Sequence, residues 1–426
     1  YHTSAWLISR SKSVNIIAML PKRIRAPILL ATLSISVSAA ALFYADTNLA
    51  IAAALLLLTA FYVRVSLQDI IYYNPSIQQP FTIPLKSASE VEPFLAKRDD
   101  AARPLQPHAE SKVVWAGKKN VQTELVVLYI HGWSSSPREI DPVDTQLAKQ
   151  LGANSLRYRL TAHGLVPLGR AGEALLTHSS KAILLRNAAT AYACAKLLGK
   201  RIVLVACSTG ATLSYWLCGQ RWAEIDKHVV CLISISPAVA LANPMYPYLK
   251  WLIALAPRLL VELVLILGAG RYRHLKIVSD EYAEVWTVIW NSKAAKHLIA
   301  LYFGLELSVV PANTDEPRIQ VPLLAFANPN DPVVSYPAHQ EFVARAFESR
   351  RIELITDSEL QHNICGRLTS PSTVDRVVEQ SLEFAKEHLG GGGNGKANGK
   401  ATPVKRPAKS PPRSGGGNGS AARKRK

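Results

Sequence analysis

Short apolar runs separated by polar turns recur between residues 111 and 389, and this pattern predicts the fold. Seven runs have the composition of strands in a buried sheet, and longer segments between or after them are typical of helices. The predicted strands are Lys112–Ala116, Leu125–Ile130, Ser155–Leu160, Ile202–Cys207, Val229–Ile235, Pro322–Ala327 and Arg351–Ile355. The predicted helices are Pro137–Leu151, Ser180–Leu198, Thr209–Ala223, Pro337–Phe347 and Thr373–His388. Strands that alternate with helices indicate an α/β domain with a mostly parallel sheet and helices on both faces.

Residues 237–321 interrupt this alternation. The interval separates two predicted strands and is too long for a simple crossover connection. Within it, Tyr248–Leu267 contains only three charged residues, and the basic run Arg271–His274 follows. We interpret residues 237–321 as a helical cap insertion over the functional site of the domain.

Two uncharged segments near the N-terminus predict a transmembrane helical hairpin at residues 26–63. Residues 26–45 and 47–63 contain no charged side chain, and Asp46 lies between them in a short polar turn. The first segment has the roughly 20 apolar residues that are needed to cross a bilayer. Basic residues flank both outer ends of the hairpin, so we expect both ends, and the domain that follows, to face the cytoplasm. A signal peptide is disfavoured because two apolar segments are adjacent.

Three further segments flank the hairpin and the domain. Residues 1–25 are basic, and we interpret residues 1–18 as translated upstream sequence with Met19 as the start. Residues 64–110 are rich in proline and are interpreted as a connector that packs against the next domain. Residues 390–426 are rich in Gly, Asn, Pro and basic residues, which predicts a disordered basic tail.

The net charge of +18 comes mostly from the two ends of the chain. Residues 1–25 carry five Lys or Arg and residues 390–426 carry ten, with no acid in either segment, which leaves +3 for the remainder. A nearly neutral body argues against nucleic-acid binding by the domain. The basic tail is most simply interpreted as solubilising, and beside the predicted membrane anchor its natural partner is anionic lipid. The five Cys are odd in number and none are spaced C-x-x-C, so neither a disulfide framework nor a metal site is expected.

The fourth predicted strand ends in Cys-Ser-Thr-Gly, immediately before a predicted helix. A sharp turn from strand to helix is the context in which a serine at the apex becomes a nucleophile. Ser208 would be this serine, because the small residues Ala206 and Gly210 flank it at the two crowded positions of the turn. The alternative register makes Cys207 the nucleophile but puts larger side chains at those positions, so Ser208 is favoured.

A serine hydroxyl is a weak nucleophile unless a histidine, oriented by a buried carboxylate, accepts its proton. In sheets of this kind the acid and the histidine follow the serine along the chain, on loops after later strands. Asp331 lies just beyond the sixth predicted strand, and His362 lies just beyond the seventh. Both positions are at the carboxyl edge of the sheet, where ligands bind. The competing acids are Asp357 and Glu359, and the competing histidine is His339.

Negative charge that develops on a reacting oxygen needs backbone amide donors. The amide of Thr209, directly after the candidate nucleophile, is one such donor. The second predicted strand runs into His131, Gly132 and Trp133, where the glycine lets the loop turn so that the amide of Trp133 faces the site. His131 precedes the nucleophile in the chain, and we interpret it as a residue that shapes this loop.

With these segments, the sequence resembles the α/β-hydrolase family, in particular its carboxylesterase, monoacylglycerol lipase and serine aminopeptidase-like branch. The resemblance covers Lys112–Leu389 and is carried by His131–Trp133, Arg159–Gly164, the turn at Ser208, Asn330–Val334 and His362. The chain departs from the family pattern at Ala206 and Ala162, where the family has glycine. The resemblance implies a catalytic triad of Ser208, Asp331 and His362, an oxyanion hole formed by the amides of Trp133 and Thr209, and no cofactor.

The resemblance and the predicted hairpin lead us to expect a membrane-anchored serine hydrolase. Its reaction would be the cleavage of a carboxylic ester, a small-molecule or lipid ester, through an acyl-enzyme intermediate. A thioesterase or an amidase would use the same residues, so these alternatives stay open. A third interpretation is a catalytically inert, membrane-tethered scaffold with a hydrolase fold.

Overall fold

The computed structural model describes residues 83–220, 225–256, 258–310 and 319–390. The basic segment 1–25, the predicted hairpin 26–63, the first part of the connector and the tail after residue 390 lie outside these residues. Within the described part of the chain, no helix is both long and apolar enough to cross a membrane. The described residues up to Leu389 belong to one structural unit.

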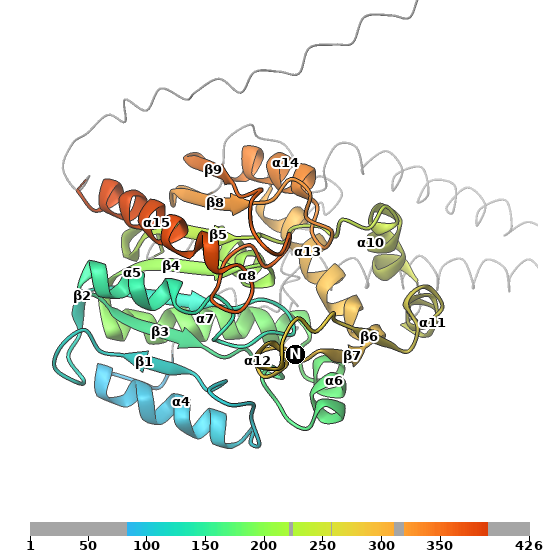
Figure 1. Ribbon diagram of the computed structural model, residues 1–426, viewed down its shortest axis with the longest axis horizontal. Coiled ribbons are helices and arrows are strands. Elements are labelled where there is room, and N and C mark those ends of the chain that lie inside the picture. The colour runs from blue at the N-terminus through green and yellow to red at the C-terminus, as the bar shows by residue number, and fades with distance from the viewer. Residues whose placement is uncertain (1–82, 221–224, 257, 311–318, 391–426) are drawn as a thin grey trace, which may run out of the picture. The chain divides into compact units, whose positions relative to one another are not determined.

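A seven-stranded sheet forms the centre of this unit, in the order β1-β3-β2-β4-β5-β8-β9 (Figure 1). Only β1 pairs with its neighbour in the antiparallel direction, and all the other pairs are parallel. The strands are β1 Lys112–Val114, β2 Thr123–Ile130, β3 Asn154–Tyr158, β4 Gly199–Cys207, β5 Val229–Ile235, β8 Leu323–Ala327 and β9 Arg350–Leu354. All seven predicted strands are therefore present, and the predicted α/β class with a mostly parallel sheet is confirmed.

Successive side chains of the central strands enter two separate apolar cores. In β2, Val126 and Leu128 pack into one core, whereas Val127 and Tyr129 pack into the other. Because both faces are covered, these strands read as continuous apolar runs rather than as alternating ones. This is the physical reason that their positions could be predicted from the sequence.

Helices cover both faces of the sheet (Figure 1). One face carries α5 and α15, which pack against each other and lie side by side in the figure. The other face carries α4, α7, α8, α13 and α14. The bounds of the helices outside the insertion are η2 Ala88–Glu90, α4 Val91–Asp100, α5 Val143–Leu151, α6 Leu168–Thr177, α7 Lys181–Leu198, α8 Thr209–Cys218, α9 Ile225–His228, α14 Tyr336–Ala346, η4 Pro371–Thr373 and α15 Val374–Leu389.

The chain between β5 and β8 forms the insertion that was predicted at residues 237–321. Its elements are α10 Tyr246–Leu255, α11 Arg258–Ala269, β6 Tyr272–His274, α12 Asp280–Ala283, β7 Ile289–Asn291, η3 Ser292–Ala294 and α13 Ala295–Val309. Most of the insertion is helical, as expected, but most of the basic run forms β6, which pairs antiparallel with β7. The insertion contacts the loops at the carboxyl edge of the sheet: the Thr287 amide donates to the carbonyl oxygen of Ser134 at 2.6 Å.

Helices α4 and α6 are absent from the predicted elements, and α5 begins later than expected. α4 lies within the connector that was expected to contain no long helix. Pro93 is the third residue of α4, and an amide in the first turn of a helix needs no partner within that helix, so proline is tolerated there. α5 begins at Val143, directly after Pro142, whereas residues 137–142 form turns.

A buried ion pair joins α4 to the segment after β3. The Arg159 guanidinium donates from Nη2 to Asp99 Oδ1 at 2.9 Å, and both side chains are almost fully buried. Arg159 also donates from Nη1 to the carbonyl oxygen of His163. Arg98, the neighbour of Asp99, donates to the carbonyl oxygen of Arg159 at 2.6 Å. The described part of the connector is thus fixed to the domain by buried polar contacts as well as by apolar packing.

The turn between β4 and α8 allows no side chain at Gly210. A Cβ atom there would lie 2.1 Å from the carbonyl oxygen of Ile130. We predict that Gly210→Ala destabilises the fold by about 3 kcal/mol and lowers the melting temperature by about 6–12 °C, because the backbone of β2 must move. The measurement is thermal unfolding of the full chain followed by circular dichroism.

Gly169→Ala in α6 is the matched control. No atom lies within 4 Å of the added Cβ at that position. Alanine in a helix is also favoured over glycine, so we expect a change of at most about 1 kcal/mol, in the stabilising direction. Equal melting temperatures for Gly210→Ala and the wild-type chain would contradict the close approach of α8 to β2.

Candidate active site

Ser208 lies at the apex of the turn between β4 and α8, in a backbone conformation that a serine rarely adopts. Its φ is 49° and its ψ is −115°. The Ser208 amide donates to the carbonyl oxygen of Ile235, and the Ser208 carbonyl oxygen accepts from the amides of Ala211 and Ala238. These bonds hold a strained backbone in place, as in a nucleophile elbow.

Cys207, the alternative nucleophile, is buried in the core opposite the one that contains Ala206. Burial raises the pKa of the Cys207 thiol well above its ordinary value, and the nearby Glu139 carboxylate raises it further. A thiol is nucleophilic as its thiolate, so this environment disfavours Cys207 as a nucleophile. All five cysteines are free and buried.

The structure brings together the three side chains that chain order had singled out. Ser208 Oγ lies 3.2 Å from His362 Nε2, and His362 Nδ1 lies 2.7 Å from Asp331 Oδ2. Because the carboxylate accepts the proton of Nδ1, Nε2 is the nitrogen that is free to accept a proton from the serine hydroxyl. The Asp331 side chain is 2% exposed and the His362 side chain 18% exposed.

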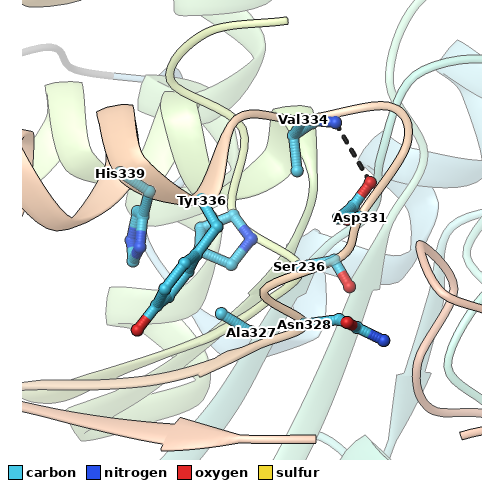
Figure 2. A pocket seen from close by; sticks show the side chains of 8 residues that line it. Ser236, Ala327, Asn328, Asp331, Val334, Tyr336 and His339 are labelled. Carbon is cyan, nitrogen blue, oxygen red and sulfur yellow. Dashed lines mark hydrogen bonds between the residues drawn. The ribbon is translucent and has the colours of Figure 1, made fainter. Parts of the chain in front are cut away.

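Backbone groups fix the orientation of Asp331. Its Oδ1 atom accepts hydrogen bonds from the amides of Val333 and Val334, at 2.8 and 3.0 Å, which leaves Oδ2 for the histidine. Figure 2 shows Asp331 at the edge of a small cavity of about 10 Å³, with the bond from Val334 drawn as a dashed line. A cavity of this size has room for about one water molecule.

The loop after β9 holds His362 and directs the two competing acids elsewhere. The carbonyl oxygen of His362 accepts from the Ser236 hydroxyl and from the amide of Ile364. Asp357 is exposed, and its hydrogen bond with Arg376 lowers the pKa of the carboxyl group. Glu359 accepts hydrogen bonds from the amide and the hydroxyl of Ser372.

The competing histidine, His339, belongs to the core rather than to the candidate triad. Its side chain is buried in α14, and its Nε2 atom lies 2.9 Å from the Tyr215 hydroxyl. Burial lowers the pKa of His339 to about 3, so the imidazole is neutral at physiological pH. In the view of Figure 2, His339 lies on the opposite side of Tyr336 from Asp331.

One candidate amide donor directly follows Ser208, and the loop that carries the other lies close to the Ser208 side chain. Thr209 is the first residue of α8, so its amide is one of those at a helix N-terminus that lack a partner in the helix. In the loop of the other donor, a Cβ atom on Gly132 would lie 3.0 Å from Ser208 Cβ. The loop that carries Trp133 therefore lies directly against the candidate nucleophile.

Both ring nitrogens of His131 stabilise this loop. Nε2 accepts from the amide of Leu160 at 3.0 Å, so Nδ1 carries the proton and donates to the carbonyl oxygen of Gly132 at 2.8 Å. Burial lowers the pKa of His131 well below its ordinary value, and the nearby His163 lowers it further. His131 thus connects the loop after β2 to the chain after β3 and does not face Ser208 as a base.

Glu139 is a residue of the site that the sequence reasoning missed. Its Oε2 atom accepts from the amide of Gly132 at 2.6 Å and from the hydroxyl of Tyr129 at 3.0 Å. Burial raises the pKa of the Glu139 carboxyl group above its ordinary value, although these hydrogen bonds favour the ionised form. The carboxylate fixes the residue immediately before the candidate donor Trp133. In the sequence Glu139 fell within an expected helix, and no local pattern distinguishes it from an exposed acid.

A comparison with known protein families matches the part of the chain that contains these residues. Residues 122–366 match a family model described as serine aminopeptidase, S33, and this range contains Ser208, Asp331, His362 and Glu139. No curated protein sequence matches the chain.

Solved structures of hydrolytic enzymes resemble the fold. One comes from work on the metagenome-derived lipolytic enzymes LipS and LipT. Its sequence is 18% identical, the match covers 67% of this chain and 100% of that chain, and the TM-score is 0.49. Another is Est1E from Butyrivibrio proteoclasticus with bound ferulic acid, with 15% identity, coverage of 66% and 95%, and a TM-score of 0.42. A third is a soluble variant of monoglyceride lipase from Saccharomyces cerevisiae, with 12% identity, coverage of 66% and 91%, and a TM-score of 0.42.

The raised pKa of Glu139 predicts a pH-dependent contribution to stability. A carboxyl group whose pKa is higher in the folded than in the unfolded state stabilises the fold most below its unfolded pKa, and this contribution is lost as pH rises through the folded pKa. Glu139→Gln removes the titration. The free energy of unfolding of the wild type minus that of the variant should therefore fall as pH rises above about 4.3, the ordinary pKa of a glutamate in an unfolded chain. Urea denaturation of both chains over a series of pH values measures this difference.

Glu359→Gln provides a control of opposite sign. Glu359 is slightly desolvated, but its hydrogen bonds outweigh this effect and lower its pKa. Its contribution is present above the unfolded pKa and is lost as pH falls. A wild-type-minus-variant difference for Glu139→Gln that does not change with pH would show that this carboxyl group titrates normally.

Proposed function

Because the chain belongs to the serine aminopeptidase S33 family, we propose that it is a membrane-anchored serine hydrolase that cleaves a carboxylic ester. The observation that carries the proposal is the continuous chain of hydrogen-bonding groups from Ser208 Oγ through the His362 imidazole to Asp331. A serine in a strained turn, an imidazole within reach of its hydroxyl and a buried carboxylate behind the imidazole are the parts that acyl transfer requires.

In the first step, Ser208 Oγ attacks the carbonyl carbon of the ester while His362 Nε2 accepts the hydroxyl proton. Asp331 keeps Nδ1 protonated and stabilises the imidazolium that forms. The tetrahedral intermediate collapses to an acyl-serine when His362 returns the proton to the alcohol that leaves. Water then attacks the acyl-serine while His362 Nε2 accepts its proton, which gives a second tetrahedral intermediate. As the bond from Oγ to the acyl carbon breaks, His362 returns the proton to Ser208 Oγ and the carboxylic acid departs.

The amides of Thr209 and Trp133 are proposed to donate to the oxyanion of both tetrahedral intermediates. Support comes from the position of Gly132 against Ser208 Cβ and from the bonds that Glu139 and His131 make to the Gly132 peptide unit. Donors held in position before the reaction stabilise developing charge without reorganising at the moment of reaction. Glu139 would thus be a positioning residue.

The apolar side chains around Trp133 favour a substrate with an apolar acyl group. The Trp133 ring packs edge-on against Trp290 at 5.9 Å between ring centroids. It also contacts apolar clusters formed by the insertion, which include Leu298 and Tyr302. An acyl or lipid ester is therefore our proposed substrate. The predicted hairpin at residues 26–63 would hold the enzyme at a membrane, with the domain on the cytoplasmic side.

The triad predicts a set of matched substitutions. Ser208→Ala should reduce the turnover of a p-nitrophenyl ester by a factor of about 10⁴ or more, and Asp331→Asn by about 10⁴, because each removes a group on which the others depend. Asp357→Asn alters an exposed acid of the loop that carries His362, and it should change the rate by less than about twofold.

A fluorophosphonate probe separates the hydrolase from an inert scaffold. Labelling of the wild-type chain that disappears in Ser208→Ala and in His362→Ala is the expected result. A folded wild-type chain that is not labelled would favour the scaffold interpretation. Labelling of Cys207 in place of Ser208 would overturn the assignment of the nucleophile.

Acyl chain length tests the proposed substrate. Across p-nitrophenyl esters from acetyl to lauroyl, KM should fall by about fourfold for each methylene that the site buries, until the site is filled. The thioester and anilide of the preferred acyl group should react more slowly than the ester, as judged by kcat/KM. A higher kcat/KM for the thioester or the anilide would replace the ester in the proposal.

A further inference from the structure

Exposed apolar side chains concentrate on one part of the insertion. Of the fourteen large apolar side chains that are exposed among the described residues, nine lie between residues 245 and 278. They are Met245, Tyr248, Leu259, Leu260, Leu263, Leu267, Tyr272, Ile277 and Val278. A cluster of this kind marks a contact surface, whereas single exposed apolar residues are ordinary.

The leucines of α11 form a continuous stripe. Leu259, Leu263 and Leu267 recur every fourth residue and are 82%, 50% and 76% exposed. Val261 and Leu265 are buried on the side of α11 that packs against the rest of the insertion. The inner side of α11 is therefore buried, as in an ordinary surface helix. Its outer side, which would usually be polar, presents leucine to solvent instead. We call the outer side, together with residues 271–278, the α11 face.

The exposed charges of the α11 face are all positive. Arg258, Arg271, Arg273 and Lys276 are exposed. The sole acid between residues 245 and 279 is Glu262. Glu262 is largely buried and is neutralised by ion pairs with Arg258, Lys293 and Lys296. An apolar stripe bordered by cations complements a surface that is apolar inside and anionic outside.

We propose that the α11 face docks on an anionic phospholipid bilayer, with the leucine stripe at the boundary of the acyl chains and the cations against lipid headgroups. Two other occupants fit the charges less well. The apolar residues 26–63 contain one acid, Asp46, and cannot neutralise the cations of the α11 face that lie outside the ion pairs of Glu262. A second copy of the chain would bring the same cations against each other, because a two-fold interface joins identical surfaces.

Docking would orient the catalytic face toward the membrane, because the insertion also contacts the loops at the carboxyl edge of the sheet. Tyr302 in α13 bonds through its hydroxyl to Thr209 Oγ1 at 2.9 Å, next to Ser208. The inference does not depend on catalysis, since the face exists whether or not Ser208 reacts. Its test can therefore fail or succeed independently of the proposed function.

The test measures the environment of α11 in the full chain. Since all native cysteines are buried, Leu267→Cys offers a single accessible thiol for an environment-sensitive dye. The labelled chain is reconstituted into phosphatidylcholine vesicles with or without about one third phosphatidylglycerol. We expect a blue shift and quenching by brominated lipid in the anionic vesicles only. Val121→Cys, at an exposed valine just before the amino end of β2 and so at the opposite edge of the sheet, is the control and should show neither effect.

A charge reversal tests the cations separately from the anchor. Arg271→Glu with Arg273→Glu should abolish the blue shift at residue 267, as should about 0.5 M salt, because both remove the attraction to anionic headgroups. Lys118→Glu with Lys149→Glu makes the same change in net charge at exposed positions outside the insertion, and it should leave the shift intact.

Three outcomes would overturn the proposal. A dye at residue 267 that stays in water on anionic vesicles excludes docking by this face. An equal shift on neutral and anionic vesicles excludes recognition of anionic lipid. A shift that appears without lipid and grows with protein concentration identifies a second copy of the chain as the occupant. The same measurements in Ser208→Ala should match those in the active chain, which keeps this test separate from that of the hydrolase.

Discussion

The close approach of Gly210 to the carbonyl oxygens of Ile130 and His131 is the constraint on which the candidate site depends. It lets the first turn of α8 lie directly against the end of β2. Ser208 then projects beside the loop that begins at His131, with its Cβ close to Gly132, the residue before Trp133. Any side chain at residue 210 would separate the serine from this loop, so the geometry at one glycine determines whether two distant segments form one site.

The same elbow stores strain that the surrounding core must balance. Ser208 has a positive φ, and so does Ser236 at the end of the neighbouring strand β5. Conformations of this kind persist where the adjoining elements leave no alternative. Here β4 and β5 are buried along their whole apolar length, and their parallel pairing fixes where each strand stops. The buried strands β4 and β5 thus hold the strained backbone of Ser208 and Ser236 in place beside the candidate site.

Much of the fold could be predicted because each buried strand is an apolar run, and the order of serine, acid and histidine could be predicted because each follows a strand end. Position after a strand end favoured Asp331 and His362, but the sequence did not show why Asp357 and His339 have other roles. Those roles depend on partners such as Arg376 and Tyr215, which come from other parts of the chain. Glu139 escaped notice for the same reason, since its burial depends on β2 and on the loop after it. Pro93 concealed α4 because a proline inside a helix usually ends it. In the first turn of a helix, where Pro93 lies, proline is tolerated.

The ion pair between Asp99 and Arg159 has a mechanical consequence. α4 is the first α-helix of the described chain. Its carboxylate holds Arg159, which in turn bonds to the carbonyl oxygen of His163, whose ring lies 5.5 Å from that of Trp133. The position of α4 is therefore coupled through buried side chains to the loop beside Ser208, and not only to the outer surface of the domain.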